Sequence, residues 1–247
     1  MNQLIIDAGN TRVKAAIYST SGFIPLDMQA GLSVQALSLL AGKYKPVAGI
    51  LSSVINIDAG VLEMIKALPY SLVLDHQTPL PFKNKYASPA TLGHDRLANA
   101  AGALHFLPAK NVLTIDAGTC LKFDFINAAA EYLGGAISPG ILLRYKALHQ
   151  YTGKLPLLEP VTDAELIGNS TEGSIHSGIL NGMVEEINGI ISRYEKEFDN
   201  VQLILTGGDA RYFLNHLKKP IFATPELTLR GLQTILAFNY QHGHSQN

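Results

Sequence analysis

The sequence predicts an α/β protein built from a duplicated unit, in which three short strands precede alternating helices and strands. The main observation is a phrase that occurs twice, as LIIDAGNTRVK at residues 4–14 and as LTIDAGTCLKFD at residues 113–124. The second observation is size, because 247 residues with 47% hydrophobic content can bury the cores of two ordinary domains. We therefore expect one domain at residues 1–110 and the other at residues 111–247.

The first half has the pattern of a strand meander followed by helices and strands. Apolar runs and tight turns predict three short strands, a helix, a buried strand and a second helix, at residues 4–6, 13–18, 22–25, 33–43, 47–54 and 59–68. Residues 77–96 contain Pro79, Pro81 and Pro89, which exclude a continuous helix or a central strand. We expect this stretch to be a loop that leads into a helix.

The second half repeats the plan. Its pattern predicts three strands, a helix, a long helix, a strand and a last helix, at residues 112–115, 121–127, 131–136, 140–151, 174–198, 203–205 and 228–240. The clearest of these is the long helix, whose apolar residues recur every three or four positions. The irregular stretch at 152–169 is broken by glycine and proline, and we interpret it as a connector or a substrate loop.

Composition narrows the classes of function. Nineteen basic and 20 acidic residues give a formal charge of −1, so we expect no nucleic-acid partner. The uncharged stretch at 28–42 is too short and too polar to cross a bilayer, and we expect no membrane segment. A single cysteine, Cys120, is typical of a reducing compartment and favours the cytoplasm.

The repeated Asp-Ala-Gly phrase has the chemistry of a phosphate site. Asp7 and Asp116 each follow an apolar strand, while Gly9 and Gly118 allow backbone N–H groups to face an anion. Carboxylates at such a cradle suit the magnesium ion that a nucleotide carries. Neutral donors follow in both copies, namely Asn10, Thr11 and Thr119. One copy alone would be ordinary turn chemistry, but two at matching positions favour phosphate binding.

Two further phrases lie at predicted helix starts. Gly207 and Gly208 of TGGDA stand between a strand and a helix, where a nucleotide can lie against glycine backbone. The chain has neither the Walker pattern nor the dinucleotide glycine pattern. In GHDR at 93–96, Asp95 read alone is a first-turn carboxylate that the helix dipole favours, and His94 read alone is a turn residue. No histidine or cysteine spacing indicates a zinc site.

Together these phrases resemble type III pantothenate kinases, a branch of the superfamily of acetate and sugar kinases, actin and heat-shock ATPases. Six pieces carry the resemblance, in the family's order: DAGNTRVK at 7–14, GHDR at 93–96, DAGTCLKFD at 116–124, GGAISPG at 134–140, STEGSIHSG at 170–178 and TGGDA at 206–210. The resemblance implies two tandem ribonuclease-H-like (actin-like ATPase) domains with a nucleotide cleft between them. It also implies ATP-dependent phosphorylation of pantothenate, the first step of coenzyme A biosynthesis.

The resemblance assigns roles to residues. It implies that Asp95 is the catalytic base, that Asp116 binds the family's monovalent cation, usually K⁺, and that Asp7 meets the Mg²⁺ of the nucleotide. It places ATP on Asp7, Ala8, Gly9, Asn10, Thr11, Arg12, Val13, Lys14, Thr119, Gly207 and Gly208. It places pantothenate on Tyr86, Gly93, His94, Asp95, Arg96 and Thr171. Because Thr171 would reach the substrate across a dimer interface, a homodimer is implied.

The chain also departs from the family pattern. Ser170 stands where the family commonly has asparagine, and Leu121 and Lys122 stand where it has small or hydroxyl residues. Lys122 could replace part of the cation requirement, but the alternation of a strand favours a side chain that points to solvent. Two other functions stay open: another small-molecule kinase of the superfamily, with a different alcohol acceptor, and a nucleotide-binding regulatory protein without turnover.

Overall fold

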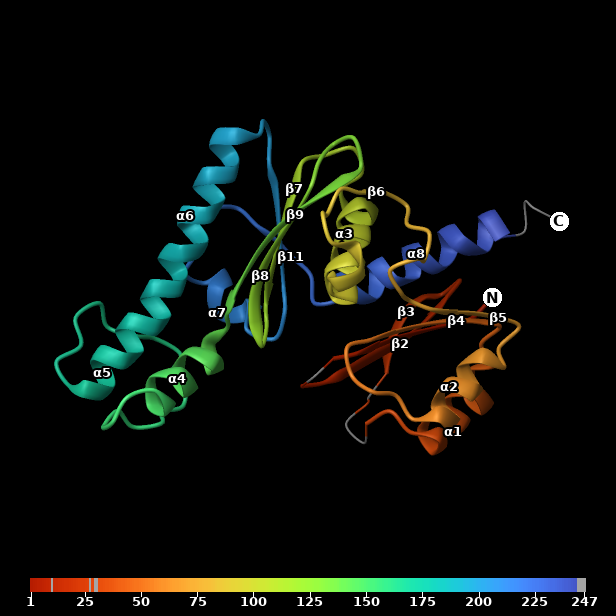
Figure 1. The fold of residues 1–247 in the computed structure, drawn as a ribbon, viewed down its shortest axis with the longest axis horizontal. Coiled ribbons are helices and arrows are strands. Elements are labelled where there is room, and N and C mark those ends of the chain that lie inside the picture. Colours follow the sequence, from red (N-terminus) through yellow and green to blue (C-terminus); the bar gives the residue numbers. More distant parts are fainter. Residues whose placement is uncertain (10, 27, 29–30, 244–247) are drawn as a thin grey trace. The chain divides into compact units, whose positions relative to one another are not determined.

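The computed structural model describes residues 1–9, 11–26, 28 and 31–243, and the chain packs as two compact units (Figure 1). Unit 1 contains Met1–Pro108, Ala130–Leu133 and Glu226–Asn247, and unit 2 contains Ala109–Ala129 and Gly134–Pro225. The last segment of the chain therefore belongs with the first. The domains predicted from the sequence, residues 1–110 and 111–247, each contain one copy of the repeated phrase. Their boundary as duplicated domains stays a prediction.

Unit 1 is built on a five-stranded sheet in the order β3-β2-β1-β4-β5. The strands are β1 (Gln3–Ala8), β2 (Val13–Ser19), β3 (Gly22–Leu26), β4 (Ala48–Ser53) and β5 (Tyr70–Val73). The first three are antiparallel, as two tight turns require, while β4 runs parallel to both β1 and β5. The carboxyl ends of β1 and β4 therefore lie at the same edge of the sheet.

Helices cover this sheet. They are α1 (Val34–Tyr44), α2 (Ala59–Lys66), α3 (His94–Phe106) and α8 (Leu227–Gly243), with a short 3-10 turn, η1 (Pro89–Thr91). Leu37 of α1 and Val61 of α2 are buried in one core with Ile6 and Ile17 of the sheet. Helix α8 lies along the sheet and packs against α3 (Figure 1).

The packing of α3 against α8 depends on two glycines. A Cβ at Gly231 would overlap the carbonyl oxygen of Ala98, and one at Gly102 would overlap that of Leu227. The backbones can approach this closely only because neither glycine has a side chain. A buried hydrogen bond joins the helices, from Thr228 Oγ1 to Asn99 Oδ1 at 2.8 Å.

The second sheet has six strands in the order β11-β10-β7-β8-β9-β6. Their bounds are β6 (Lys83–Asn84), β7 (Val112–Ala117), β8 (Cys120–Ile126), β9 (Glu131–Pro139), β10 (Gln202–Thr206) and β11 (Phe222–Ala223). As in unit 1, the strand that precedes the Asp-Ala-Gly turn has an antiparallel partner on one side and a parallel partner on the other. This repeated pairing agrees with a duplicated unit.

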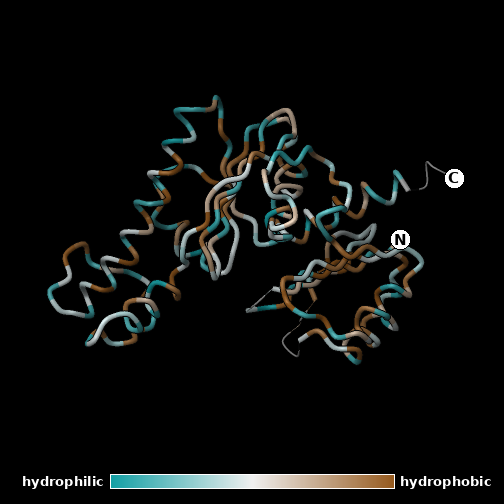
Figure 2. Tube along the Cα trace, in the orientation of Figure 1, coloured by the Kyte–Doolittle hydropathy of each residue, from teal (hydrophilic) through white to brown (hydrophobic). Residues whose placement is uncertain are grey.

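In unit 2 the apolar face of the long predicted helix is buried against the sheet. The helices of this unit are α4 (Ile141–Gln150), α5 (Thr171–His176), a π-helical turn η2 (Ser177–Asn181), α6 (Gly182–Glu197) and α7 (Ala210–Leu214). Met183, Ile187 and Ile191 of α6 are fully buried against Phe123 and Leu113 of the sheet. Figure 2 shows hydrophobic residues concentrated along the strands of both units.

The structure confirms the predicted strands and helices, with ends that differ by a few residues. The long helix begins three residues early, because the Ser170 hydroxyl accepts the backbone N–H of Gly173 at 3.0 Å and caps the first turn. The pattern does not predict the short strands β5, β6 and β11, whereas α7 is the helix expected after TGGDA. In the described part of the chain, no helix is both long enough and apolar enough to cross a membrane.

We predict that Gly231→Ala destabilises the protein by about 1–3 kcal/mol, because the added methyl meets backbone that cannot rotate away. The matched control is Gly189→Ala in α6, where a Cβ meets no atom within 4 Å. This control should gain about 0.5–1 kcal/mol from lower chain entropy. The free energies of unfolding come from urea titrations, and equal values for the two variants would contradict the packing described.

Candidate functional site

The first Asp-Ala-Gly phrase forms a hairpin between β1 and β2. The Gly9 N–H donates to the Arg12 carbonyl oxygen at 3.2 Å, and Asp7 is the register partner of Lys14 across the two strands. Thr11 and Arg12 are exposed at the turn, while Lys14 is half-buried. Asn10 lies outside the described residues. The hairpin thus gathers a carboxylate, an ammonium and a hydroxyl at one end of the sheet.

Asp7 also meets the neighbouring parallel strand. The Ser52 hydroxyl donates to Asp7 Oδ1 at 3.2 Å, and Ser52, which is fully buried, is its register partner on β4. This bond holds the carboxylate at the edge where both strands end. Sequence reasoning missed Ser52; the available signal was a pair of consecutive hydroxyl residues closing an apolar strand.

The GHDR phrase begins α3 beside the same edge. His94 Nδ1 lies 3.2 Å from the carbonyl oxygen of Ser53, the last residue of β4. Ser53 is in turn the register partner of Ala8, the residue after Asp7. Two consecutive serines therefore connect the hairpin to the start of α3, and the structure brings Asp7 and the Asp95 helix turn to one edge of unit 1.

Gly93 leaves room for the Asp95 carboxylate beside the backbone at the start of α3. Asp95 Oδ1 accepts the backbone N–H of Arg96 at 2.9 Å, and a Cβ at Gly93 would lie only 2.6 Å from the same oxygen. The side chain of Asp95 therefore folds back over Gly93, in space that only glycine leaves open. Asp95 stays half-buried in the first turn of the helix.

Arg96 and Tyr86, which the resemblance assigns to the acceptor, lie close to one another. Arg96 is 4% exposed, and its guanidinium carbon lies 5.4 Å from the centroid of the Tyr86 ring. Tyr86 is itself 6.2 Å from the ring of Tyr132. A guanidinium stacked on an aromatic ring keeps its edge donors in a fixed plane, which suits a planar anion such as a carboxylate.

In unit 2 the second Asp-Ala-Gly turn is held by hydrogen bonds from two other segments, the start of α4 and the turn after β10. The Gly140 N–H donates to the Thr119 carbonyl oxygen at 3.2 Å, at the start of α4. Thr206 of β10 is the parallel register partner of Asp116, and the Asp209 N–H donates to Ala117 at 2.9 Å. Asp116, Thr119, Gly207 and Gly208 are therefore brought to one edge of unit 2.

Gly207 is required by its conformation. Its φ is +101°, which side chains rarely adopt, and a Cβ there would overlap the carbonyl oxygen of Ala117. Gly208 has no such constraint, because a Cβ built on it meets nothing within 4 Å. Burial raises the pKa of the nearby Asp209 carboxyl, so the charged form is disfavoured at this turn.

Lys122 does not point to solvent, and that expectation is wrong. Its Nζ lies 2.8 Å from Asp116 Oδ2, and the two side chains are only 15% and 14% exposed. They are register partners on the antiparallel strands β7 and β8, so they share a face of the sheet. The alternation of β8 does not reveal this neighbour, because Asp116 lies on another strand, β7.

Thr171 lies apart from the other predicted residues of unit 2. It lines a groove of about 880 Å³ formed by α4, α5 and η2, whose walls include Leu148, Tyr151, Leu155, Ile175 and Ile179. Asp116, Thr119, Gly207 and Gly208 are not among the residues that line it. Below the groove the Tyr145 hydroxyl lies 2.7 Å from His176 Nδ1 and joins α4 to α5. Two effects raise the pKa of Tyr145 to about 12: the larger is burial of its hydroxyl, and the smaller is the electrostatic effect of the nearby Tyr212.

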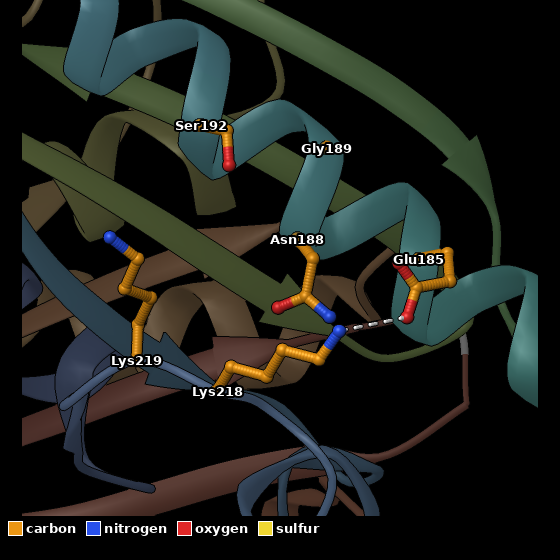
Figure 3. A pocket seen from close by; sticks show the side chains of 6 residues that line it. All are labelled: Glu185, Asn188, Gly189, Ser192, Lys218 and Lys219. Atoms are coloured by element: carbon orange, nitrogen blue, oxygen red, sulfur yellow. Dashed lines mark ion pairs between the residues drawn. The ribbon is translucent and has the colours of Figure 1, made fainter.

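A second, smaller cavity has no part in this site. Its volume is about 270 Å³, and it lies between α6 and the loop that contains Lys218 and Lys219 (Figure 3). Lys218 Nζ is 3.7 Å from Glu185, and Lys219 Nζ is 2.9 Å from Glu195. No residue singled out from the sequence lines this cavity.

The family model of type III pantothenate kinase matches residues 3–193. A type III pantothenate kinase of Christiangramia forsetii is 43% identical over 240 residues, with 96% of this chain and 98% of that protein covered. Another, of Phocaeicola vulgatus, is 40% identical over 237 residues and covers 96% and 98%. Both matches extend over nearly the whole length of each protein.

Solved structures show the same fold at low identity. A ROK hexokinase of Thermus thermophilus has a TM-score of 0.54 at 14% identity and covers 98% of this chain and 100% of that one. The activator of 2-hydroxyisocaproyl-CoA dehydratase of Clostridium difficile, with bound ADPNP, has a TM-score of 0.52 at 12% identity and covers 100% and 98%. The expected architecture of two tandem ribonuclease-H-like, actin-like ATPase domains is confirmed.

We predict that Gly207→Ala destabilises the protein by about 1–3 kcal/mol, because it combines a strained φ with a clash against backbone. Its neighbour offers a control, since Gly208→Ala adds a methyl in open space and should change stability by less than about 0.5 kcal/mol. Urea titration of both variants measures the difference. Equal stability would mean that the turn does not have the described conformation.

Proposed function

This chain belongs to the type III pantothenate kinase family, and from that premise we propose how its residues transfer the γ-phosphoryl group of ATP to the primary hydroxyl of pantothenate. This reaction is the first step of coenzyme A biosynthesis. One observation carries the proposal: Ser52 and Ser53 connect the Asp7 hairpin to the helix start that holds Asp95. A phosphate-binding turn and a candidate base thus share one edge of unit 1.

The hairpin is proposed to bind the phosphates of ATP. Thr11 at the exposed turn adds a hydroxyl, and Lys14 adds a positive charge. Asp7, fixed by Ser52, offers the hard oxygen ligands that Mg²⁺ prefers, and a bound Mg²⁺ would neutralise charge on the phosphate oxygens. The remaining nucleotide contacts are proposed at Ala8, Asn10, Arg12, Val13, Thr119, Gly207 and Gly208.

Asp95 is proposed as the general base. Phosphoryl transfer depends chiefly on positioning and on electrostatic stabilisation, and the base accepts the proton of the attacking hydroxyl. The Arg96 N–H, which donates to Asp95 Oδ1 at 2.9 Å, orients the carboxylate at the start of α3. An oriented carboxylate is the arrangement that a general base requires.

The acceptor is proposed to lie on Tyr86 and on residues 93–96. Pantothenate carries a carboxylate as well as the hydroxyl that is phosphorylated, and the buried Arg96 guanidinium can bind a carboxylate through two parallel hydrogen bonds. Stacking on Tyr86 holds the guanidinium plane in place. Gly93 and His94 complete the turn that faces the acceptor.

We propose that the enzyme is a cytoplasmic homodimer whose second copy covers the groove beside Thr171. The groove has mostly apolar walls, and Tyr151 on its rim is 80% exposed. Leu166 and Ile167, in the loop that leads to α5, are 79% and 83% exposed. Apolar side chains gathered this way indicate a protein interface. Thr171 would then contact the acceptor bound to the partner.

The monovalent cation that the resemblance implies does not fit this chain as well as magnesium does. Its expected ligand is Asp116, and the Lys122 ammonium already lies 2.8 Å from that carboxylate. A potassium ion on the same oxygens would face a like charge at close range. We therefore assign the cation no step in the reaction.

We predict that Asp95→Asn lowers kcat by about 10²- to 10⁴-fold and leaves the fold intact, because the amide cannot accept the proton. Pantothenate-dependent release of ADP measures turnover, and circular dichroism checks the fold. Glu63→Gln on α2, an exposed carboxylate of the same unit, is the control and should retain wild-type turnover. Wild-type turnover in Asp95→Asn would remove this residue from the mechanism. Release of ADP with a panel of sugars but not with pantothenate would indicate a different acceptor.

We predict that Tyr151→Glu converts the dimer to monomer and lowers pantothenate-dependent turnover at least about tenfold, because a carboxylate cannot be buried unpaired in an apolar interface. Sedimentation velocity measures the oligomeric state. Leu39→Glu, which changes a 70% exposed residue of α1, should affect neither quantity. A Tyr151→Glu protein that remains dimeric would place the interface elsewhere.

A further inference from the structure

The Asp116–Lys122 ion pair is largely buried and lies within the sheet, unlike an ion pair on the protein surface. Both side chains are about seven-eighths buried, at 14% and 15% exposure, and their charged atoms are 2.8 Å apart. They lie directly opposite one another in the ladder of β7 and β8, next to the turn that contains Thr119. Burial disfavours the charged form of a lysine. A nearby carboxylate offsets this loss of hydration by stabilising the positive charge.

The duplication places a lysine at the matching position of unit 1. There Asp7 of β1 is the register partner of Lys14 of β2, as Asp116 of β7 is of Lys122 of β8. In both units the aspartate precedes the glycine of the turn, and the lysine follows the turn on the antiparallel strand. Each Asp-Ala-Gly carboxylate therefore has a cationic side chain directly across the ladder.

The ammonium has the properties that a monovalent cation would supply at Asp116. It carries one positive charge, it is close to potassium in size, and its three donors can approach oxygen atoms in several directions. Unlike a free ion, the ammonium is attached to the strand. Its placement beside Asp116 therefore requires no loss of the translational entropy that binding a free ion would require. A second cation at the same carboxylate would be repelled.

We infer that the Lys122 ammonium takes the place of a monovalent cation beside Asp116, so that this kinase works without potassium. Lys122 acts as a positioning residue: its fixed charge holds Asp116 and the Thr119 turn in the arrangement that nucleotide binding needs. This inference rests on the proposed phosphorylation of pantothenate.

The first test measures kcat/KM of the full-length enzyme with ATP, Mg²⁺ and pantothenate, in KCl and in choline chloride of equal ionic strength. The wild type should differ by less than twofold between the two salts. Lys122→Thr should lose at least tenfold in choline chloride and recover at least part of that loss in KCl. Lys122→Arg, which retains the charge, should resemble the wild type, and so should the control Lys196→Thr at an exposed position of α6.

The second test needs no turnover, so it separates this inference from the proposed function. Thermal unfolding of the unliganded protein is followed while KCl is titrated against choline chloride. The Tm of the wild type should be the same in both salts, whereas the Tm of Lys122→Thr should rise selectively with KCl, because potassium can then bind Asp116.

Three results would overturn the inference. They are a wild-type enzyme that loses more than tenfold without potassium, a wild-type Tm that rises selectively with KCl, and a Lys122→Thr enzyme that is fully active in choline chloride. By contrast, a wild type that releases no ADP with pantothenate in either salt would overturn the proposed function. The Tm comparison would still decide whether potassium binds.

Discussion

The parallel register of two strand pairs, β1 with β4 and β7 with β10, determines where chemistry can occur in this protein. In each pair the strands end together, so that Asp7 lies opposite Ser52 and Asp116 lies opposite Thr206. Residues that follow the strands are therefore delivered to one edge of each sheet. The Asp7 hairpin, the start of α3 and the Gly207 turn all depend on this alignment, and a shift of one residue would turn both carboxylates to the opposite face.

The two copies of the Asp-Ala-Gly turn have the same backbone plan but different surroundings. In unit 1 the carboxylate accepts a hydrogen bond from a buried serine, and its lysine across the ladder is half-buried. In unit 2 the carboxylate forms a close ion pair with its lysine. The two turns thus share a backbone plan, with a buried serine hydroxyl on the carboxylate of unit 1 and a lysine ammonium 2.8 Å from the carboxylate of unit 2.

The sequence predicted most of the strands and helices and the turns that carry the Asp-Ala-Gly phrase, because hydrophobic periodicity and a repeated phrase are strong signals. It failed where structure depends on contacts between distant residues. Lys122 has the alternation of a half-exposed strand, but only the pairing of β7 with β8 shows that Asp116 is its neighbour. The hydroxyl of Ser52 becomes informative only when β4 is known to lie beside β1. β6 and β11 are two residues long, which is too short for any period to be seen.

Unit 1 is discontinuous in sequence, and this affects how the protein is made. The face of α3 that carries Ala98 and Gly102 is covered by α8, the last helix among the described residues. During translation, all of unit 2 up to Pro225 emerges before α8 does. Domains generally fold as units as they leave the ribosome. The amino-terminal half therefore emerges before the helix that completes its core, and a chain that ends before Leu227 lacks the helix that covers α3, on which the candidate base Asp95 stands.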